Sequence, residues 1–419
     1  MYGHPLSRGR FQDACFEGLV ARHGSISPAA NQRLAHEVEV LEEHGLDSGL
    51  ALAAEAVRQA RDSGILVGPG HGTTAGSLAC YALELTDIDP LANALFFERF
   101  FNPVVSDRAR VNLVVQHGRV HEMADFIASR ISVDVLRMVD SVGEFSSADG
   151  SRQWHVGSVE LSVFGSKALS TIANTTALLD EDGTELDVRE VSDNDGATFE
   201  LLQRGDTEGV GGLEDDDMRR ALREFRPESI TDLAVVGALF HPGAYELLDS
   251  RGLGQAMRDA QLVTLQDVSA VTASFRPSAF DRLLDIIDER PRGSAPHYGD
   301  PRLNAVVAET AGVIVFQEQT IELAQECAGL SASAGDALRR AAGKHQRQAL
   351  EGYREQWFAG AVERGIQAGT AEEVWGDVVR AGNWAFCRSH ALACARTSYE
   401  AAYLKTHYRD EYGKAVGWA

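Results

Sequence analysis

The chain has 419 residues, 44% of them apolar, and carries a formal net charge of −23 at pH 7. This length and apolar content exclude a wholly disordered chain and predict two domains or one bilobed unit. The charge disfavours general binding to nucleic acids, because contacts with a polyanion need locally concentrated positive charge. Five cysteines without a CxxC pair, and no apolar run of the ~18 residues that span a membrane, predict a soluble cytoplasmic protein.

The first part of the chain mixes helical and strand patterns. Apolar residues recur at helical spacing over residues 28–63, with an interruption at Gly45, and predict two amphipathic helices. Residues 65–70, ILVGPG, predict a short buried strand that ends in a glycine turn, and residues 74–85 return to a helical pattern. A glycine-rich loop between a strand and a helix is, by itself, most simply a tight turn.

Further strands and then helices follow. Residues 111–116 and 155–164 predict strands, and residues 122–142 predict a helix followed by ambiguous structure. The acidic segment 180–200 predicts a surface hairpin or loop. The run of acidic residues at 214–217 predicts a helix start, because carboxylates stabilise the positive end of the helix dipole. From there predicted helices dominate, at 215–225, 230–240, 278–291, 304–329 and 334–344.

One long segment carries a family resemblance. Residues 67–103, VGPGHGTTAGSLACYALELTDIDPLANALFFERFFNP, resemble the palm signature of the C-family bacterial replicative DNA polymerases over its full length. Residues 201–244, 311–346 and 386–412 resemble successive parts of the fingers of these enzymes, in the family's order. The resemblance covers most of residues 30–419, apart from a divergent patch between about 104 and 158.

The resemblance implies an α/β plus mostly α fold. It places a nucleotidyltransferase-type palm remnant at residues 25–165, after an N-terminal arm at 1–24, and a helical fingers domain at 166–419. We also expect the family's N-terminal phosphoesterase-like domain and its sliding-clamp-binding region to be absent.

The chain departs from the family where the polymerase chemistry takes place. The family holds two divalent ions with three aspartates from two palm strands, and hard Mg²⁺ demands such ligands. The matching positions here are Asn112, Val114 and Ser162, and none of them carries a carboxylate. The short interval between Asn112 and Ser162 also implies that the thumb is deleted. We therefore expect no DNA polymerisation and weak or absent Mg²⁺ binding.

The resemblance implies a retained nucleotide- or phosphate-binding cleft. Its loop positions would be Gly68, Gly70, His71, Gly72, Thr73, Thr74 and Ser77, and its fingers positions Arg339, Arg340, Lys344, Arg388, Ser389 and His390. His71 stands where the family usually has an arginine, so phosphate affinity would be reduced or pH-dependent. We expect a small anionic ligand or nucleotide as the partner, with at most weak contact to DNA.

Other functions compete with this hypothesis. The chain could be a repurposed enzyme, for example of specialised metabolism, that acts on a nucleotide or another small molecule. Its candidate groups would be His71, Asp107, Glu160, Arg388 and His390. A residual polymerase could use Asp107 and Glu160 in a shifted register. No metal site is expected: His117 and His121 are interpreted as surface histidines, and Cys387, His390 and Cys394 as part of a helix with its cysteines in the core.

Overall fold

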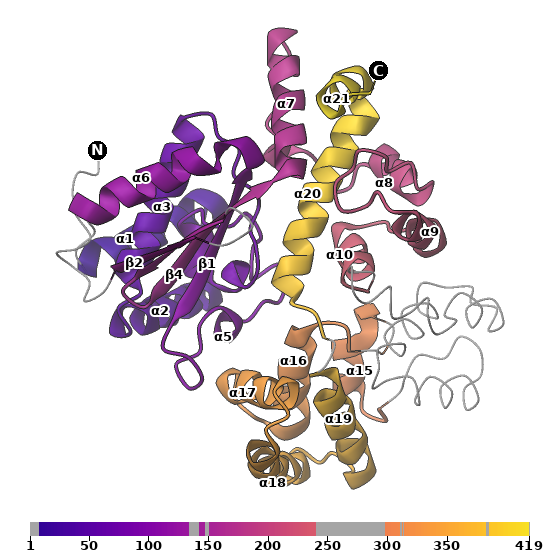
Figure 1. Cartoon of the computed structure of the whole chain (residues 1–419). Coiled ribbons are helices and arrows are strands. Elements are labelled where there is room, and N and C mark those ends of the chain that lie inside the picture. Colours follow the sequence, from indigo (N-terminus) through magenta and orange to yellow (C-terminus); the bar gives the residue numbers. More distant parts are fainter. Residues whose placement is uncertain are drawn as a thin grey trace. The chain divides into compact units, whose positions relative to one another are not determined.

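A computed structural model of the protein describes residues 8–133, 142–146, 151–239, 298–310, 312, 314–382 and 385–418 (Figure 1). Contacts divide the chain into two compact units. Unit 1 consists of residues 1–198, 207–214 and 392–419, and unit 2 of residues 199–206 and 215–391. The domain boundaries after residues 24 and 165 stay predictions. The predicted helix at 278–291 lies outside the described residues.

Unit 1 combines helices with one sheet. Its helices are α1 (Arg8–His23), α2 (Pro28–Glu43), α3 (Asp47–Asp62), α4 (Leu78–Ala82), α5 (Phe97–Phe100), α6 (Val120–Val133), α7 (Lys167–Glu181) and α21 (Arg409–Val416), with 3-10 turns at η1 (Thr74–Gly76), η2 (His117–Arg119) and η4 (Val188–Glu190). Its strands are β1 (Ala109–Gln116), β2 (Val142–Ser146), β3 (Arg152–Val156) and β4 (Val159–Ser166). Helices α8 (Gly196–Gln203) and α20 (Arg388–His407) contain residues of both units.

Local sequence signals explain the first helices. Ser27 caps α2 by accepting a hydrogen bond from the backbone of Ala30, and Pro28 occupies the first helical turn, where its missing N–H costs nothing. Between α2 and α3, Gly45 adopts a φ of +67°, which a residue without a Cβ does most easily. The two predicted helices and the break between them are therefore confirmed.

The sheet has four strands in the order β1-β4-β3-β2. Strands β1 and β4 are parallel, and β3 pairs antiparallel with both β4 and β2. The prediction of one strand over residues 155–164 is wrong, because Gly157 turns the chain with a φ of +59° and splits the run into β3 and β4. The strand predicted at 65–70 is reduced to a single bridge between Val67 and Val115.

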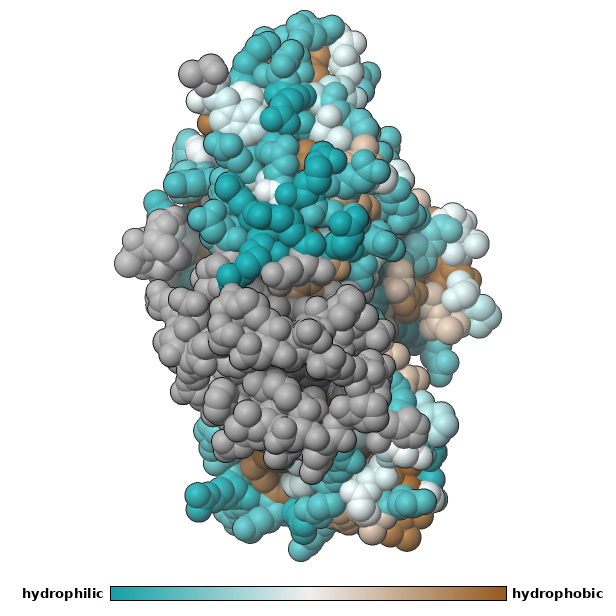
Figure 2. Space-filling view, turned by 90° about the vertical axis from the view of Figure 1, so that its right-hand side faces the viewer, coloured by the Kyte–Doolittle hydropathy of each residue, from teal (hydrophilic) through white to brown (hydrophobic). Residues whose placement is uncertain are grey.

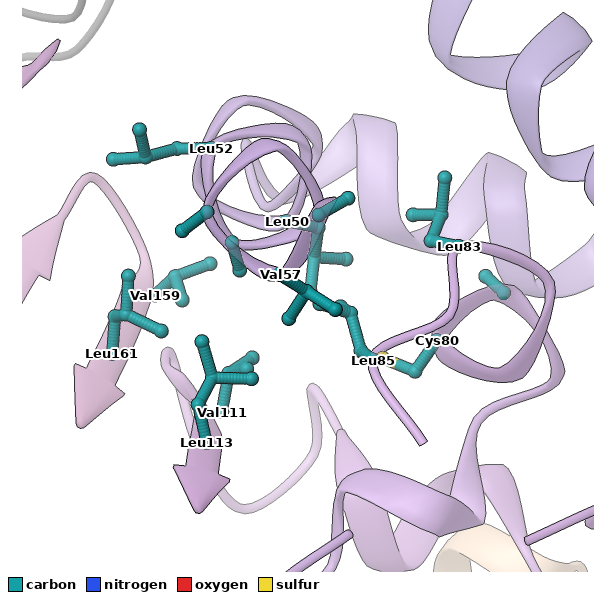
Figure 3. Packing of buried hydrophobic residues seen from close by; sticks show 14 of the residues in the cluster. Leu50, Leu52, Val57, Cys80, Leu83, Leu85, Val111, Leu113, Val159 and Leu161 are labelled. Atoms are coloured by element: carbon teal, nitrogen blue, oxygen red, sulfur yellow. The ribbon is translucent and has the colours of Figure 1, made fainter. Parts of the chain in front are cut away.

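One face of the sheet packs against α3. Figure 3 shows Val57 of this helix on the side of Val111 of β1 and Val159 of β4, and all three residues are buried. Gly49 allows this close approach, because a Cβ there would lie 2.5 Å from the Val159 Cγ2 atom. The alternating burial along β1 places every second side chain in this core.

The opposite face of the sheet is more open. It carries Arg110, Asn112 and Val114 from β1, none of which is fully buried, and Glu160 and Ser162 from β4. We call it the loop face, because the glycine loop, residues 67–77, contacts it. It is the face on which the expected polymerase positions lie.

The acidic segment at 180–200 forms a loop up to the start of α8, without a strand among residues 182–195. Helix α20 holds this loop in place: the Tyr399 hydroxyl donates a 2.6 Å hydrogen bond to the Ser192 carbonyl, and Arg396 pairs with Asp193. Of the two structures predicted for this segment, a hairpin or a loop, the loop is confirmed.

Unit 2 is helical throughout its described part. Its helices are α9 (Asp216–Phe225), α10 (Ile230–Leu239), α15 (Pro301–Val307), α16 (Gln317–Ala328), α17 (Ala332–Gly343), α18 (Arg347–Glu363) and α19 (Ala368–Ala381), with a 3-10 turn at η5 (Ala308–Thr310). Asp215 caps α9 by accepting from the backbone of Met218, which confirms the predicted helix start. The indole rings of Trp357 and Trp375 meet edge to face, 5.5 Å apart, in the core of this unit.

The single helix predicted over residues 304–329 is interrupted. Gly312 has a φ of +81°, and α16 starts only at Gln317. The Gln319 side chain accepts hydrogen bonds from the backbone N–H groups of Val315 and Phe316, at 2.8 and 2.9 Å, and thereby satisfies the donors that the interruption leaves open.

Among the described helices, none combines the length and apolar character needed to cross a membrane. Figure 2 shows one face of the protein, on which the described residues are mostly hydrophilic and the hydrophobic ones form small groups. This distribution agrees with the strongly charged composition.

Candidate functional site

The glycine loop runs along the free edge of β1. The Gly68 N–H donates a 2.8 Å hydrogen bond to the Val114 carbonyl, and Val67 bridges Val115. At the next residue, the Pro69 carbonyl accepts from the Thr86 hydroxyl at 2.7 Å and from the Asp87 N–H at 2.8 Å. The loop therefore starts from a rigid position beside the sheet.

The middle of the loop lies against the loop face. Gly72 has a φ of +63°, and a Cβ on it would lie 2.8 Å from the Asn112 Nδ2 atom. The Asn112 N–H donates to the Thr74 hydroxyl at 3.3 Å. One residue before Gly72, the His71 ring stacks on Phe164 of β4, with centroids 5.4 Å apart. The loop thus contacts both β1 and β4.

The three expected aspartate positions lie together in this region. Asn112 and Ser162 are direct partners in the parallel register of β1 and β4, and Val114 lies two residues further along the same face of β1. No group of three or more His, Cys, Asp or Glu residues suited to a metal ion occurs in the described part of the chain.

Burial shapes the chemistry of His71. Desolvation lowers the pKa of its imidazole below the usual value, so the ring is neutral at neutral pH. An arginine at this position would carry a permanent charge, whereas a neutral imidazole contributes a hydrogen bond and a stacking surface.

Ser77 belongs to the framework beneath the loop. It is fully buried, caps α4, and donates a 2.8 Å hydrogen bond to the buried carboxyl of Glu37. Burial raises the pKa of Glu37, although Arg33, 2.9 Å away, acts in the opposite direction. Arg33 also donates to the Gly76 carbonyl, so α2 holds the end of the loop. Sequence reasoning missed Arg33 and Glu37, because no local motif connects them to the loop.

Charged residues occupy one end of the loop face. Glu160 accepts from Arg110 Nε at 2.7 Å, and its second oxygen lies 3.8 Å from both Arg108 and His155. Glu160 is therefore surrounded by positive or hydrogen-bonding groups, and Asp107, before β1, is exposed. Sequence reasoning singled out Glu160 but not its partners on β1 and β3.

The fingers positions lie in unit 2, where most contact neighbouring side chains. Arg339 and Arg340 both donate to the buried carboxylate of Asp336. Lys344 is exposed directly after α17. Ser389 is buried, with its hydroxyl 3.1 Å from the Cys387 thiol, and the ring of His390 stacks on Phe386.

Arg388 has two acidic neighbours. Its guanidinium pairs with Glu309 at 2.8 Å, and its backbone N–H donates to the buried carboxylate of Glu318 at 2.9 Å. Only 10% of its side chain is exposed. These contacts fix the start of α20, and the expected ligand contact of Arg388 stays a prediction.

The residues considered as metal ligands do not form a site in the described structure. His117 and His121 are both exposed, as predicted. The core position expected for the two cysteines is wrong, since Cys394 of α20 is exposed and Cys387, directly before this helix, is half-buried. Helical spacing turns successive positions of α20 toward different surroundings, and only some of them lie in a core.

Together, these features define a two-unit protein: one unit has a glycine loop on a mixed sheet, and the other is helical in its described part. Family models match both. Residues 10–155 match the bacterial DNA polymerase III alpha NTPase domain, and residues 168–248 and 247–365 match the finger domain of the same subunit. The chain belongs to the bacterial DNA polymerase III alpha subunit family, which confirms the resemblance.

Several curated relatives carry the name DNA polymerase III subunit alpha. The Halalkalibacterium halodurans protein is 26% identical and the alignment covers 96% of this chain, and the Bacillus subtilis protein is 25% identical over 94%. The Thermus aquaticus protein is 25% identical over 92% of the chain. The chain spans 38 to 42% of the length of these relatives.

Proposed function

We propose that this chain is a catalytically degenerate relative of the DNA polymerase III alpha subunit, which binds a nucleotide or another phosphate ligand at the glycine loop and does not polymerise DNA. One observation carries the proposal. The expected metal-binding positions, Asn112, Val114 and Ser162, share one face of the sheet and offer no carboxylate.

Electrostatics explains why this arrangement would not support polymerisation. Two divalent ions close together repel each other strongly unless carboxylates compensate their charge. Glu160 lies on the same face of the sheet, but its carboxylate is already paired with Arg110 and Arg108. A residual polymerase that uses Glu160 and the exposed Asp107 would first have to break these ion pairs.

The same region suits direct contact with a phosphate ligand. Gly72 brings the loop backbone against Asn112, and the neighbouring Thr73 and Ser162 provide hydroxyl groups. Backbone and side-chain donors of this kind bind phosphate oxygens. Thr74 and Ser77 are left out, because both are fully buried and their hydroxyl groups are bonded to the Asn112 N–H and to Glu37. The fingers residues of unit 2 remain a separate proposal as ligand contacts.

The length of the alignment with a relative supports the loss of the thumb, the segment that grips the DNA duplex in the family. The alignment with the H. halodurans protein extends over 505 positions, more than the 419 residues of this chain, so the relative has internal sequence without a counterpart here. We propose that this sequence includes the thumb. DNA would then bind weakly and with a steep dependence on salt.

Primer extension with Mg²⁺ or Mn²⁺, run beside nucleotide binding by isothermal titration calorimetry, tests the proposal. We expect no extension but measurable nucleotide binding. Extension that disappears in Asp107→Ala or Glu160→Ala would show an active site in shifted register. Absence of binding to every nucleotide and phosphate probe would refute the binding function.

A second candidate is a repurposed enzyme. It is favoured by the position of His71, a neutral imidazole that stacks on Phe164 and directly precedes Gly72, the residue that lies against Asn112. Such a group can accept a proton from a small substrate. A turnover of a nucleotide or metabolite that His71→Gln abolishes, while binding persists, would favour this candidate.

A further inference from the structure

A second set of residues on the loop face forms a row across three strands. Arg110 on β1 is the register partner of Glu160 on β4, and Glu160 is in turn the partner of His155 on β3. Arg108 precedes β1 and places its Nη1 atom 3.2 Å from the His155 Nδ1 atom. We call Arg108, Arg110, His155 and Glu160 the arginine row.

The arginine row has an excess of positive charge. Two guanidinium groups share the single carboxylate of Glu160, with contacts of 2.7 and 3.8 Å. Arg110 uses its Nε atom for this pair, and its two terminal amino groups have no hydrogen bond to any residue that the structure describes. This local excess of positive charge contrasts with the net charge of −23 on the whole chain.

Fold stability alone does not account for this arrangement. The Arg110 side chain is 74% exposed and that of Arg108 is 41% exposed. Exposed ion pairs of this kind add little to the free energy of folding, because water screens them. The row instead presents planar guanidinium groups to solvent, and such groups can each bind two phosphate oxygens.

Neutral donors continue the site along the strands. The next row on the same face consists of Asn112, Ser162 and Gln153, which are register partners. Rows two residues apart are separated by about 7 Å, which a short chain of phosphates spans. Ser162 is buried between its two partners, so the ligand would meet two guanidinium groups at one end and the half-buried amides of Asn112 and Gln153 at the other.

We propose that the arginine row and its neutral neighbours bind the phosphates of a small polyphosphate ligand directly, without a metal ion. This inference rests on the proposed binding function, and it identifies the positive charges that would attract the phosphates. Where the family would use carboxylates and divalent ions, this chain places the countercharge for phosphate in its own arginines. Glu160 orients both guanidinium groups and competes with the ligand for them.

Calorimetric titration of the whole chain with inorganic pyrophosphate, in excess EDTA and again in Mg²⁺, tests the inference. We expect binding in EDTA that the double variant Arg108→Gln/Arg110→Gln weakens roughly ten-fold or more. Glu160→Gln should strengthen binding, because it removes the competing carboxylate, whereas a purely structural role for Glu160 would not predict this gain. The control Arg354→Gln removes an exposed, ion-paired arginine from α18 and should leave the affinity unchanged.

Melting temperatures of all variants show whether they are folded. Binding of pyrophosphate that requires Mg²⁺, or that survives in the folded double variant, would overturn the inference. The proposed function would still stand in that case if the chain binds a nucleotide. If the wild-type chain binds neither pyrophosphate nor any nucleotide, the proposed function itself fails.

Discussion

Asn112 and Ser162 are direct register partners on the parallel strands β1 and β4, so their side chains lie side by side on one face of the sheet. Both positions correspond to expected polymerase aspartates. Their adjacency means that two substitutions are enough to place two carboxylates within reach of one ion.

We predict that Asn112→Asp/Ser162→Asp gains affinity for Mn²⁺. Adjacent like charges on neighbouring strands repel, so the variant should be less stable than wild type in EDTA and should recover when Mn²⁺ binds. Thermal unfolding with increasing Mn²⁺ measures both effects, and Asn112→Asp alone serves as the control. An equal rise in melting temperature for the wild-type protein would contradict the expectation that Asn112 and Ser162 do not bind a metal ion.

Gly72→Ala should destabilise the fold by about 2 to 3 kcal/mol. The alanine backbone would have to keep the φ of +63°, which is unfavourable for a residue with a Cβ. Its methyl group would also lie 2.8 Å from the Asn112 Nδ2 atom. Gly64→Ala is the matched control: Gly64 has a φ of +70°, but no atom lies within 4 Å of the place its methyl group would take, so the change should cost only about 1 kcal/mol. Chemical denaturation measures both values. Equal decreases in the free energy of unfolding would mean that Gly72 is not in close contact with Asn112.

Arg388→Ala should lower the free energy of unfolding by about 1 to 3 kcal/mol, because it leaves the Glu309 carboxylate without its 2.8 Å partner. Glu309→Gln removes the same ion pair from the other side and should show a similar loss. Chemical denaturation and nucleotide titration of both variants show whether Arg388 stabilises the fold or binds the ligand. Unchanged stability together with weaker nucleotide binding would instead identify Arg388 as a ligand contact.

Stability should depend on pH through Glu400. Burial raises the pKa of this carboxyl in the folded protein to about 7, despite Arg396 at 2.8 Å. Because the folded state holds this proton more tightly than the unfolded state, the contribution of Glu400 is fully present below the unfolded pKa. It is lost as the pH rises from about 4.5 to about 7.

Glu400→Gln should therefore stabilise the protein at pH 8 relative to wild type, by an amount on the order of 3 kcal/mol, and flatten the pH profile above pH 5. Unfolding free energies at several pH values measure the effect. Part of the slope should remain, because burial also raises the pKa of Glu322 to about 7. The exposed Asp410→Asn is the control, and a profile of Glu400→Gln parallel to that of wild type would contradict the prediction.

Local patterns in the sequence determined much of the secondary structure. The helices on either side of Gly45 and the start of α9 at Asp215 follow from periodicity, glycine and capping residues, which act within a few positions of the chain. The family motif likewise identified Asn112, Val114 and Ser162 as the positions to compare, because a motif is a property of the order of residues.

Contacts between distant residues were decided only by the tertiary structure. Nothing in the sequence order shows that Glu37 accepts from Ser77, or that Arg110, Glu160 and His155 form one row. Strand register and burial set these contacts, and both depend on how separate segments pack. The sequence by itself determined that Asn112, Val114 and Ser162 carry no carboxylate. The fold decided which charged side chains lie near these positions, because electrostatic interaction depends on distance in space.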